Sequence, residues 1–150
     1  MSFLRNIALS NEIKKLESII LYLRQKAMAG SNPYQLQFFP AKNSYSYKTK
    51  YGKTNLITLN KNIAFGFIEK SKGPPSSPKK TISSSVTFKN KSSHETATLS
   101  TDGKITPGTI YLIDTKKKYM QALTLPIGQI SYIRRYRYQN NNWIPIEEHQ

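Results

Sequence analysis

The chain has 150 residues, a length at which one hydrophobic core is usual, so a single domain is expected. Its 23 Lys and Arg against 8 acidic residues give a formal charge of +15, which favours anionic partners but names no function. The absence of Cys excludes thiolate catalysis and a disulfide framework, and no apolar run approaches the roughly 18 residues that span a bilayer.

The N-terminal region has the periodicity of an amphipathic helix from Phe3 to about Ala29. Apolar residues recur there at spacings of four and three, which places them on one stripe. The stripe consists of Leu9, Ile13, Leu16, Ile20, Leu23 and Ala27. Gly30 and Pro33 follow, and they predict a helix end near residue 29, because glycine suits the left-handed residue after a helix and proline cannot continue it.

This helix allows two interpretations. In the first, its stripe simply packs against the rest of the domain, as amphipathic helices usually do. In the second, a helix of about 27 residues, roughly 40 Å long at 1.5 Å per residue, overhangs a domain of this size.

The chain divides into this helix, residues 1–30, and a β-rich domain, residues 31–150, where short aromatic and β-branched runs alternate with turn residues. The predicted fold class is therefore α+β, with one long N-terminal amphipathic helix packed on one or more antiparallel β-sheets. The predicted strands are residues 34–39, 44–51, 55–59, 63–68, 82–89, 96–100, 109–114, 119–125 and 129–139.

Turn and loop signals separate these strands. Residues 69–81 combine Gly, three Pro, Ser and Lys, which predicts an exposed, mobile loop. The pair Asp102-Gly103 predicts a hairpin between its flanking strands. Three consecutive Asn at residues 140–142 predict another turn before Trp143.

No constellation in the sequence predicts catalysis, a cofactor or a metal site, so we expect the protein not to be an enzyme. His94 lies beside a Ser-rich stretch and His149 lies next to the C-terminus, settings that are untypical of a catalytic histidine. The carboxylates have no calcium-loop spacing, and no glycine-rich phosphate loop is present. A metal site built from distant carboxylates remains an open alternative.

The last predicted strand carries Arg134, Arg135, Tyr136, Arg137 and Tyr138, a combination that can bind phosphates and stack on bases. Strand alternation places Arg135 and Arg137 on one face and the other three on the opposite face. The alternative is a solvated edge strand whose charge discourages aggregation.

A second basic run predicts a hairpin tip. It consists of Lys116, Lys117 and Lys118, between two predicted strands. Solubility is the first role expected of such a tip, because water screens its like charges, and attraction of anions is the second.

The order of segments resembles a known family. An amphipathic helix ending LESIILYLRQKAMAG precedes YQLQF, and VTFKN, STDGKITPGTIYLID, MQALTLPIGQISYIRRYRY and Trp143 follow after a variable loop. This order resembles the globular domain of H-type minor pseudopilins of type II secretion and of related type IV minor pilins.

The resemblance can be followed residue by residue. Residues 23–28 match the end of the family's helix, and Phe88 matches its aromatic strand. Gly103, and Gly108 with Thr109 and Ile110, match its glycine positions and the strand that follows. Residues 128–137 match its closing strand. The acidic calcium loop of the major pseudopilins has no counterpart here, which favours a minor component.

The resemblance implies a structural subunit of a pilus or pseudopilus in type II secretion or type IV pilus assembly. The family helix begins with a processed, methylated N-terminus and about twenty apolar residues. That half is not in this sequence, so we expect this chain to start after it. The implied location is an inner-membrane-anchored filament with the domain in the periplasm or on the cell surface. The implied partners are other pilin subunits, bound by the helix stripe and sheet surfaces.

Two further functions remain open. One is a minor pilin that binds DNA for uptake through Arg134, Arg135 and Arg137, with Tyr136 and the lysines of residues 116–118 assisting. The other is a free-standing nucleic-acid-binding β domain unrelated to pilins.

Overall fold

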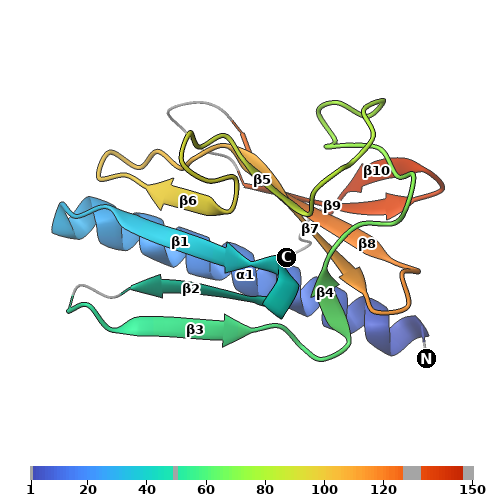
Figure 1. Cartoon of the computed structure of the whole chain (residues 1–150), viewed down its shortest axis with the longest axis horizontal. Coiled ribbons are helices and arrows are strands. Elements are labelled where there is room, and N and C mark those ends of the chain that lie inside the picture. The colour runs from blue at the N-terminus through green and yellow to red at the C-terminus, as the bar shows by residue number, and fades with distance from the viewer. Residues whose placement is uncertain (1, 49–50, 127–132, 147–150) are drawn as a thin grey trace.

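The computed structural model describes residues 2–48, 51–126 and 133–146, and its longest element is the N-terminal helix α1, Ser2–Gly30 (Figure 1). The predicted helix is confirmed. Every residue of the predicted stripe is buried, with exposed fractions of 0 or 1%. The helix therefore packs against the domain from Leu9 to Ala27, while Leu4 and Ile7 near its start are exposed.

The strands form two antiparallel sheets. The first sheet has the order β3-β2-β1-β6. Its strands are β1 (Tyr34–Phe39), β2 (Ser44–Lys48), β3 (Thr54–Thr58) and β6 (Thr96–Leu99), with a short 3-10 helix, η1 (Pro40–Lys42), between β1 and β2. Register places Phe38 opposite Tyr45, and Leu36 opposite Ala97. These buried side chains face α1, and polar Gln, Ser and Thr alternate with them on the outer face.

The second sheet has the order β10-β9-β8-β7-β4, with β5 also paired to β7. Its strands are β4 (Ile63–Phe65), β5 (Val86–Phe88), β7 (Gly108–Asp114), β8 (Met120–Leu125), β9 (Arg134–Gln139) and β10 (Asn142–Pro145). Its central strands β7 and β8 are buried almost throughout, because α1 covers one face and the loop of residues 69–85 covers part of the other.

Most predicted strands are present but several are shorter. The predicted strands at residues 63–68 and 82–89 are reduced to Ile63–Phe65 and Val86–Phe88, because their remaining residues belong to the loop against the second sheet. β10 was not predicted. The predicted residues 49–50 and 129–132 lie outside the described part of the chain.

The hairpin predicted at Asp102-Gly103 is only partly correct. The turn exists, with Gly103 at φ +89° and Ser100 donating its N–H to the Lys104 carbonyl at 2.8 Å. However, β6 pairs with β1 in the first sheet, while β7 belongs to the second. The two strands that flank this turn therefore continue into different sheets instead of pairing along their length.

The helix joins the two sheets through one core. Rings of the first sheet and of β4 and β5 gather beside α1, with Phe38 at 5.5 to 5.7 Å from the centroids of Tyr45, Phe65 and Phe88. Burial raises the pKa of Tyr45, and the Glu12 carboxylate on α1 adds to this effect. Both sheets thus bury their apolar faces against the same helix.

A row of polar residues spaced by seven runs along one flank of α1. The Gln121 side chain of β8 donates a hydrogen bond to Ser10 at 2.9 Å. Glu17 is 3.5 Å from Arg135 of β9. Arg24 donates to the Gly103 carbonyl at 2.8 Å. A seven-residue spacing keeps a row on one side of a helix, so these contacts fix how α1 lies along the sheets.

Gly108 is required where β5 meets β7. A Cβ at this position would fall against the carbonyl of Thr87 and 2.8 Å from the Cα of Phe88. Gly108→Ala is therefore expected to force β5 away from β7 and to lower the free energy of unfolding by about 1 to 3 kcal/mol. Urea denaturation measures this loss. The matched control is Gly30→Ala, since nothing lies within 4 Å of that Cβ; an equal loss in both variants would contradict the explanation.

The loop of residues 69–81 is exposed along much of its length, but it is anchored at both ends. Ser71 and Ile82 are buried, Lys72 and Thr81 form a β-bridge, and the Trp143 indole donates a hydrogen bond to the Lys72 carbonyl at 2.7 Å. The buried residues lie near the ends of the loop, and residues 76–81 are exposed. The anchoring contacts fix the loop as an arch over the second sheet (Figure 1).

Candidate functional site

The arginine-tyrosine strand, β9, lies between β8 and β10 in the second sheet and has two different faces. Arg135 points to α1, where its guanidinium meets Glu17; the two side chains are only 5% and 20% exposed. Arg134 and Arg137 are exposed, and Tyr136 and Tyr138 are half-buried in the cluster on the sheet's other face. The predicted alternation therefore holds, but Arg135 is a core residue.

The lysines of residues 116–118 form the predicted hairpin tip between β7 and β8. Asp114 holds this tip, because its Oδ1 accepts the backbone N–H groups of Lys118 and Tyr119 at 2.8 and 2.7 Å. Thr124 pairs with Arg134, and Lys118 lies in the turn before β8, six residues or about 20 Å of extended chain from Thr124. The tip and Arg134 therefore do not form one patch.

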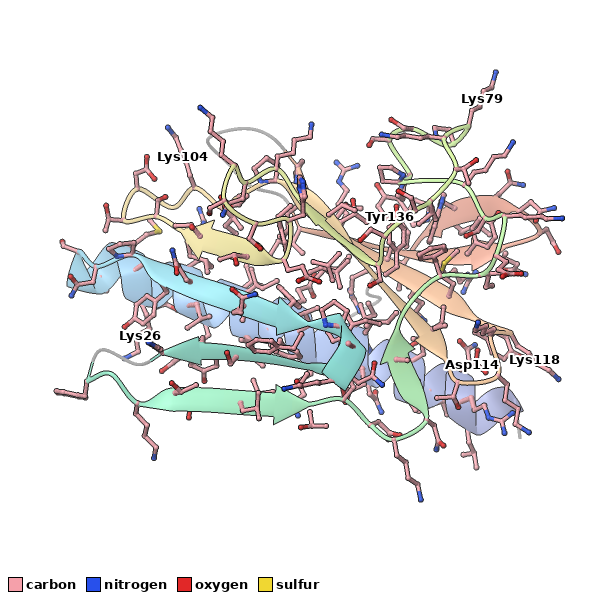
Figure 2. All side chains as sticks on the ribbon, viewed as in Figure 1. Lys26, Lys79, Lys104, Asp114, Lys118 and Tyr136 are labelled. Carbon is pink, nitrogen blue, oxygen red and sulfur yellow. The ribbon has the colours of Figure 1, made fainter. Side chains whose placement is uncertain are left out.

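Basic side chains are spread over the surface. Figure 2 shows Lys79, Lys104 and Lys118 projecting from separate loops. The charge of +15 alone consequently identifies no site, and a site must be sought where cations meet other recognition groups.

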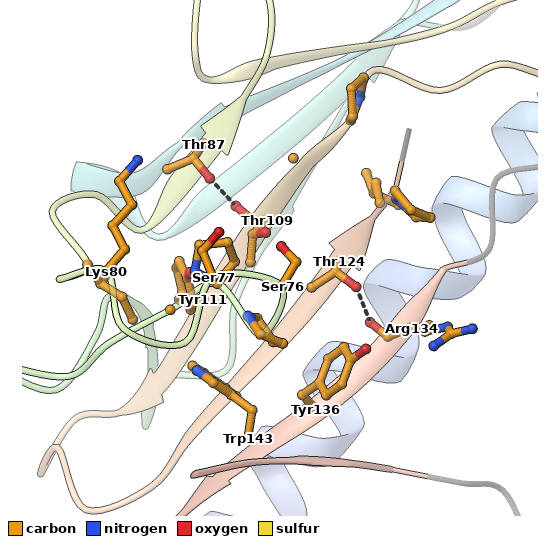
Figure 3. Close-up of a pocket in the computed structure, with 18 of the residues that line it drawn as sticks. Ser76, Ser77, Lys80, Thr87, Thr109, Tyr111, Thr124, Arg134, Tyr136 and Trp143 are labelled. Carbon is orange, nitrogen blue, oxygen red and sulfur yellow. Dashed lines mark hydrogen bonds between the residues drawn. The ribbon is translucent and has the colours of Figure 1, made fainter. Parts of the chain in front are cut away.

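A groove of about 950 Å³ lies between the loop arch and the outer face of the second sheet (Figure 3). The arch contributes Gly73 through Ser77, Lys80 and Thr81, and Ile82 and Ser83 directly follow it. The sheet contributes Thr109, Tyr111, Thr124, Tyr136 and Trp143. Trp143 lines the groove, and its ring packs against the rings of Tyr138 and Tyr111 at centroid distances of 4.9 and 5.8 Å. Burial raises the pKa of Tyr111, so this phenol stays neutral at ordinary pH.

The groove is cationic and aromatic. Lys80, Lys89 and Arg134 line it, together with the half-buried ring of Tyr136 and several Ser and Thr hydroxyls. None of the described residues that line it is acidic. Sequence reasoning found Arg134 and Tyr136, but it missed Lys80 and Lys89, which come from segments whose position depends on the tertiary fold.

A second candidate surface is the outward face of α1, opposite the buried stripe. Large apolar side chains are exposed there by 43 to 62%: Leu4, Ile7, Leu21 and Tyr22. Met28 is also exposed, but its sulfur lies beside Gly103, on the flank that contacts the β domain. Lys14 and Lys15 separate the first two from the others. The stripe that was predicted to serve both packing and assembly is buried in the chain's own core, so it offers no exposed surface.

The histidines and carboxylates do not converge on a chemical centre in the described residues. His94 uses Nδ1 to contact the Phe88 carbonyl at 3.0 Å, and His149 lies outside the described part. Within residues 2–48, 51–126 and 133–146, no three His, Asp or Glu side chains come together as a metal site would require.

Comparison with known proteins gives a match in structure only. No family model matches the chain, and neither does any curated protein. Two solved structures of the minor pseudopilin EpsH from the type 2 secretion system of Vibrio cholerae resemble it. They give TM-scores of 0.56 and 0.55 at 10% and 11% identity, and cover 83% and 84% of this chain and 94% and 92% of their own.

The chain has the pseudopilin fold. One long N-terminal helix packed on antiparallel sheets is the architecture that it shares with EpsH over nearly the full length of that domain. In the described part of this chain, no helix combines the length and the apolar character needed to cross a bilayer.

Proposed function

We propose that this chain is the globular domain of a minor subunit in a pilus or pseudopilus, with an assembly role rather than a catalytic one. The observation that carries the proposal is the division of α1 into two faces. One face is completely buried beneath both sheets, and the opposite face exposes four large apolar side chains, those of Leu4, Ile7, Leu21 and Tyr22. A helix that packs only within its own domain needs one apolar face, and a second exposed apolar face is typical of an interaction surface.

In this proposal the exposed face of α1 contacts the helices of neighbouring pilin subunits. An apolar half-helix ahead of residue 1 anchors the protein in the inner membrane and then continues α1 into the filament core. The β domain faces outward in the periplasm. The fold shared with EpsH supports an H-type subunit of type II secretion, and type IV pilus assembly is the alternative within the same plan.

Cross-linking tests the assembly role, and the natural absence of Cys gives a clean background. Single variants Leu4→Cys, Leu21→Cys and Tyr22→Cys would be made in the full-length gene and treated with a bismaleimide in the source cells. We expect cross-linked species of higher mass from these positions. Lys104→Cys, on an exposed turn of the β domain, is the matched control.

Two results would contradict the proposal. One is a set of helix variants that cross-link no better than Lys104→Cys. The other is a native gene that encodes no apolar segment upstream of α1, because the helix would then have no membrane half with which to enter a filament core.

A further inference from the structure

We propose that the groove between the loop arch and the second sheet binds single-stranded nucleic acid. The groove lies on the face of the second sheet opposite to α1, since Arg135 reaches the helix from one side of β9 while Tyr136 lines the groove from the other. The site is therefore separate from the helix surface assigned to assembly, and the two can be tested independently.

The charged groups of the groove select an anion. Lys80 comes from the arch and Arg134 from β9, and their charged ends point away from each other at the edges of the groove (Figure 3). Lys89 also lines the groove. Lysine and arginine only donate hydrogen bonds, and they match oxygens that only accept them, such as those of a phosphate. No Asp, Glu, Asn or Gln is among the described lining residues, although such side chains would suit the donor hydroxyls of a neutral sugar. Separated cations fit a ligand with several charges along its length.

The aromatic groups select a planar ring. Tyr136 and Trp143 line the same groove as these cations, and both residues are half-buried. Bases stack on such rings when they are free of a partner strand, and aromatic platforms beside a cationic track are typical of single-strand binding. In a duplex the base faces are already stacked on one another. A groove of about 950 Å³ has room for a few nucleotides of one strand but not for a double helix.

An acidic peptide is the principal competing ligand, because its carboxylates would also satisfy Lys80, Lys89 and Arg134. It offers no planar ring for Tyr136. The observations favour a nucleic acid strand for this reason, and the peptide becomes an outcome of the test.

Binding can be measured with the chain itself, using the single Trp as an internal reporter, since Trp143 lines the groove. The probes are oligothymidylate and oligouridylate of about 12 nucleotides, within the usual site size. We expect both to quench Trp143 fluorescence, with affinity that falls steeply as salt rises. An abasic oligonucleotide of equal charge should bind at least about fivefold more weakly, because one stacked base contributes at least that factor. A duplex of the same sequence and a polyglutamate peptide should also bind more weakly.

Two matched triple variants distinguish the contribution of the groove residues to affinity from the contribution of the overall charge. One combines Lys80→Ala, Lys89→Ala and Arg134→Ala; the other combines Lys116→Ala, Lys117→Ala and Lys118→Ala. Each removes three positive charges, from +15 to +12. Affinity for oligothymidylate should fall at least tenfold more in the groove variant than in the hairpin variant. Tyr136→Phe should keep the stacking and Tyr136→Leu should lose it, with thermal melting used to confirm that both fold.

Several outcomes would overturn the proposal. Equal losses in the two triple variants would mean that charge alone attracts the strand. Equal binding of the abasic oligonucleotide would remove the stacking role. Tighter binding of the duplex or of polyglutamate would assign the groove to another ligand.

Discussion

Leu16→Asp is expected to leave the domain unfolded at 25 °C. Leu16 is fully buried between α1 and the sheets, so losing its side chain costs about 2 to 5 kcal/mol. Burying a carboxyl group without a partner adds about 2 to 7 kcal/mol even when it is protonated. The sum is comparable to the entire stability of a domain, about 5 to 15 kcal/mol. Far-UV circular dichroism and Trp143 fluorescence would report the loss of structure.

The matched control for this variant is Leu21→Asp. Leu21 is on the same helix, but its side chain is 45% exposed, so the same substitution should change the free energy of unfolding by no more than about 0.5 kcal/mol. Leu16→Ala gives an intermediate point, with the melting temperature lowered by about 4 to 20 °C. A Leu16→Asp variant that melts with the parent would show that the stripe is not buried.

Arg135→Ala is expected to cost about 3 kcal/mol of stability, which is a large effect for an arginine in a basic strand. The substitution leaves the Glu17 carboxylate beside α1 without the guanidinium that now lies 3.5 Å away. Breaking a buried ion pair from one side costs about 3 to 5 kcal/mol. The lower end applies because the Glu17 side chain is 20% exposed and water reaches it. Urea denaturation at neutral pH measures the change.

Arg137→Ala provides the control for the arginine variant. Arg137 is two residues further along β9 but exposed, so its removal should change stability by about 0.5 kcal/mol or less. Replacing both partners with apolar residues, as Glu17→Met with Arg135→Leu, should restore most of the loss, because no charge is then left buried. If Arg135→Ala and Arg137→Ala cost the same, the ion pair has no special role.

The helix and its buried stripe could be predicted from the sequence because both depend on local periodicity. The positions of most strands were also predictable, since aromatic and β-branched runs ended at turn residues. The division into two sheets was not, because it depends on long-range pairing. The sequence at Asp102-Gly103 is typical of an ordinary hairpin turn. Its two flanking strands nevertheless belong to different sheets, because β6 pairs with β1 and β7 pairs with β8.

The candidate site was predictable only in part. Alternation in β9 predicted that Arg135 lies on the opposite face from Arg134 and Tyr136. The sequence does not show that Glu17 of α1 lies next to Arg135, because that contact depends on the tertiary fold. The seven-residue spacing of Ser10, Glu17 and Arg24 is visible in the sequence and places the three on one side of the helix. The arch of residues 69–81 was beyond prediction, because its composition suits a free loop, and its order comes from contacts with Trp143 and the second sheet.

The contact between Ser10 and Gln121 spans 111 residues of chain. During synthesis α1 is made before every strand that covers its apolar stripe, and β8 is one of the later strands. A nascent chain that ends before β8 therefore carries a completed amphipathic helix with part of its cover missing. Folding of this domain must wait for its C-terminal third, and until then the early helix depends on other surfaces, such as a chaperone or a membrane, to shield it.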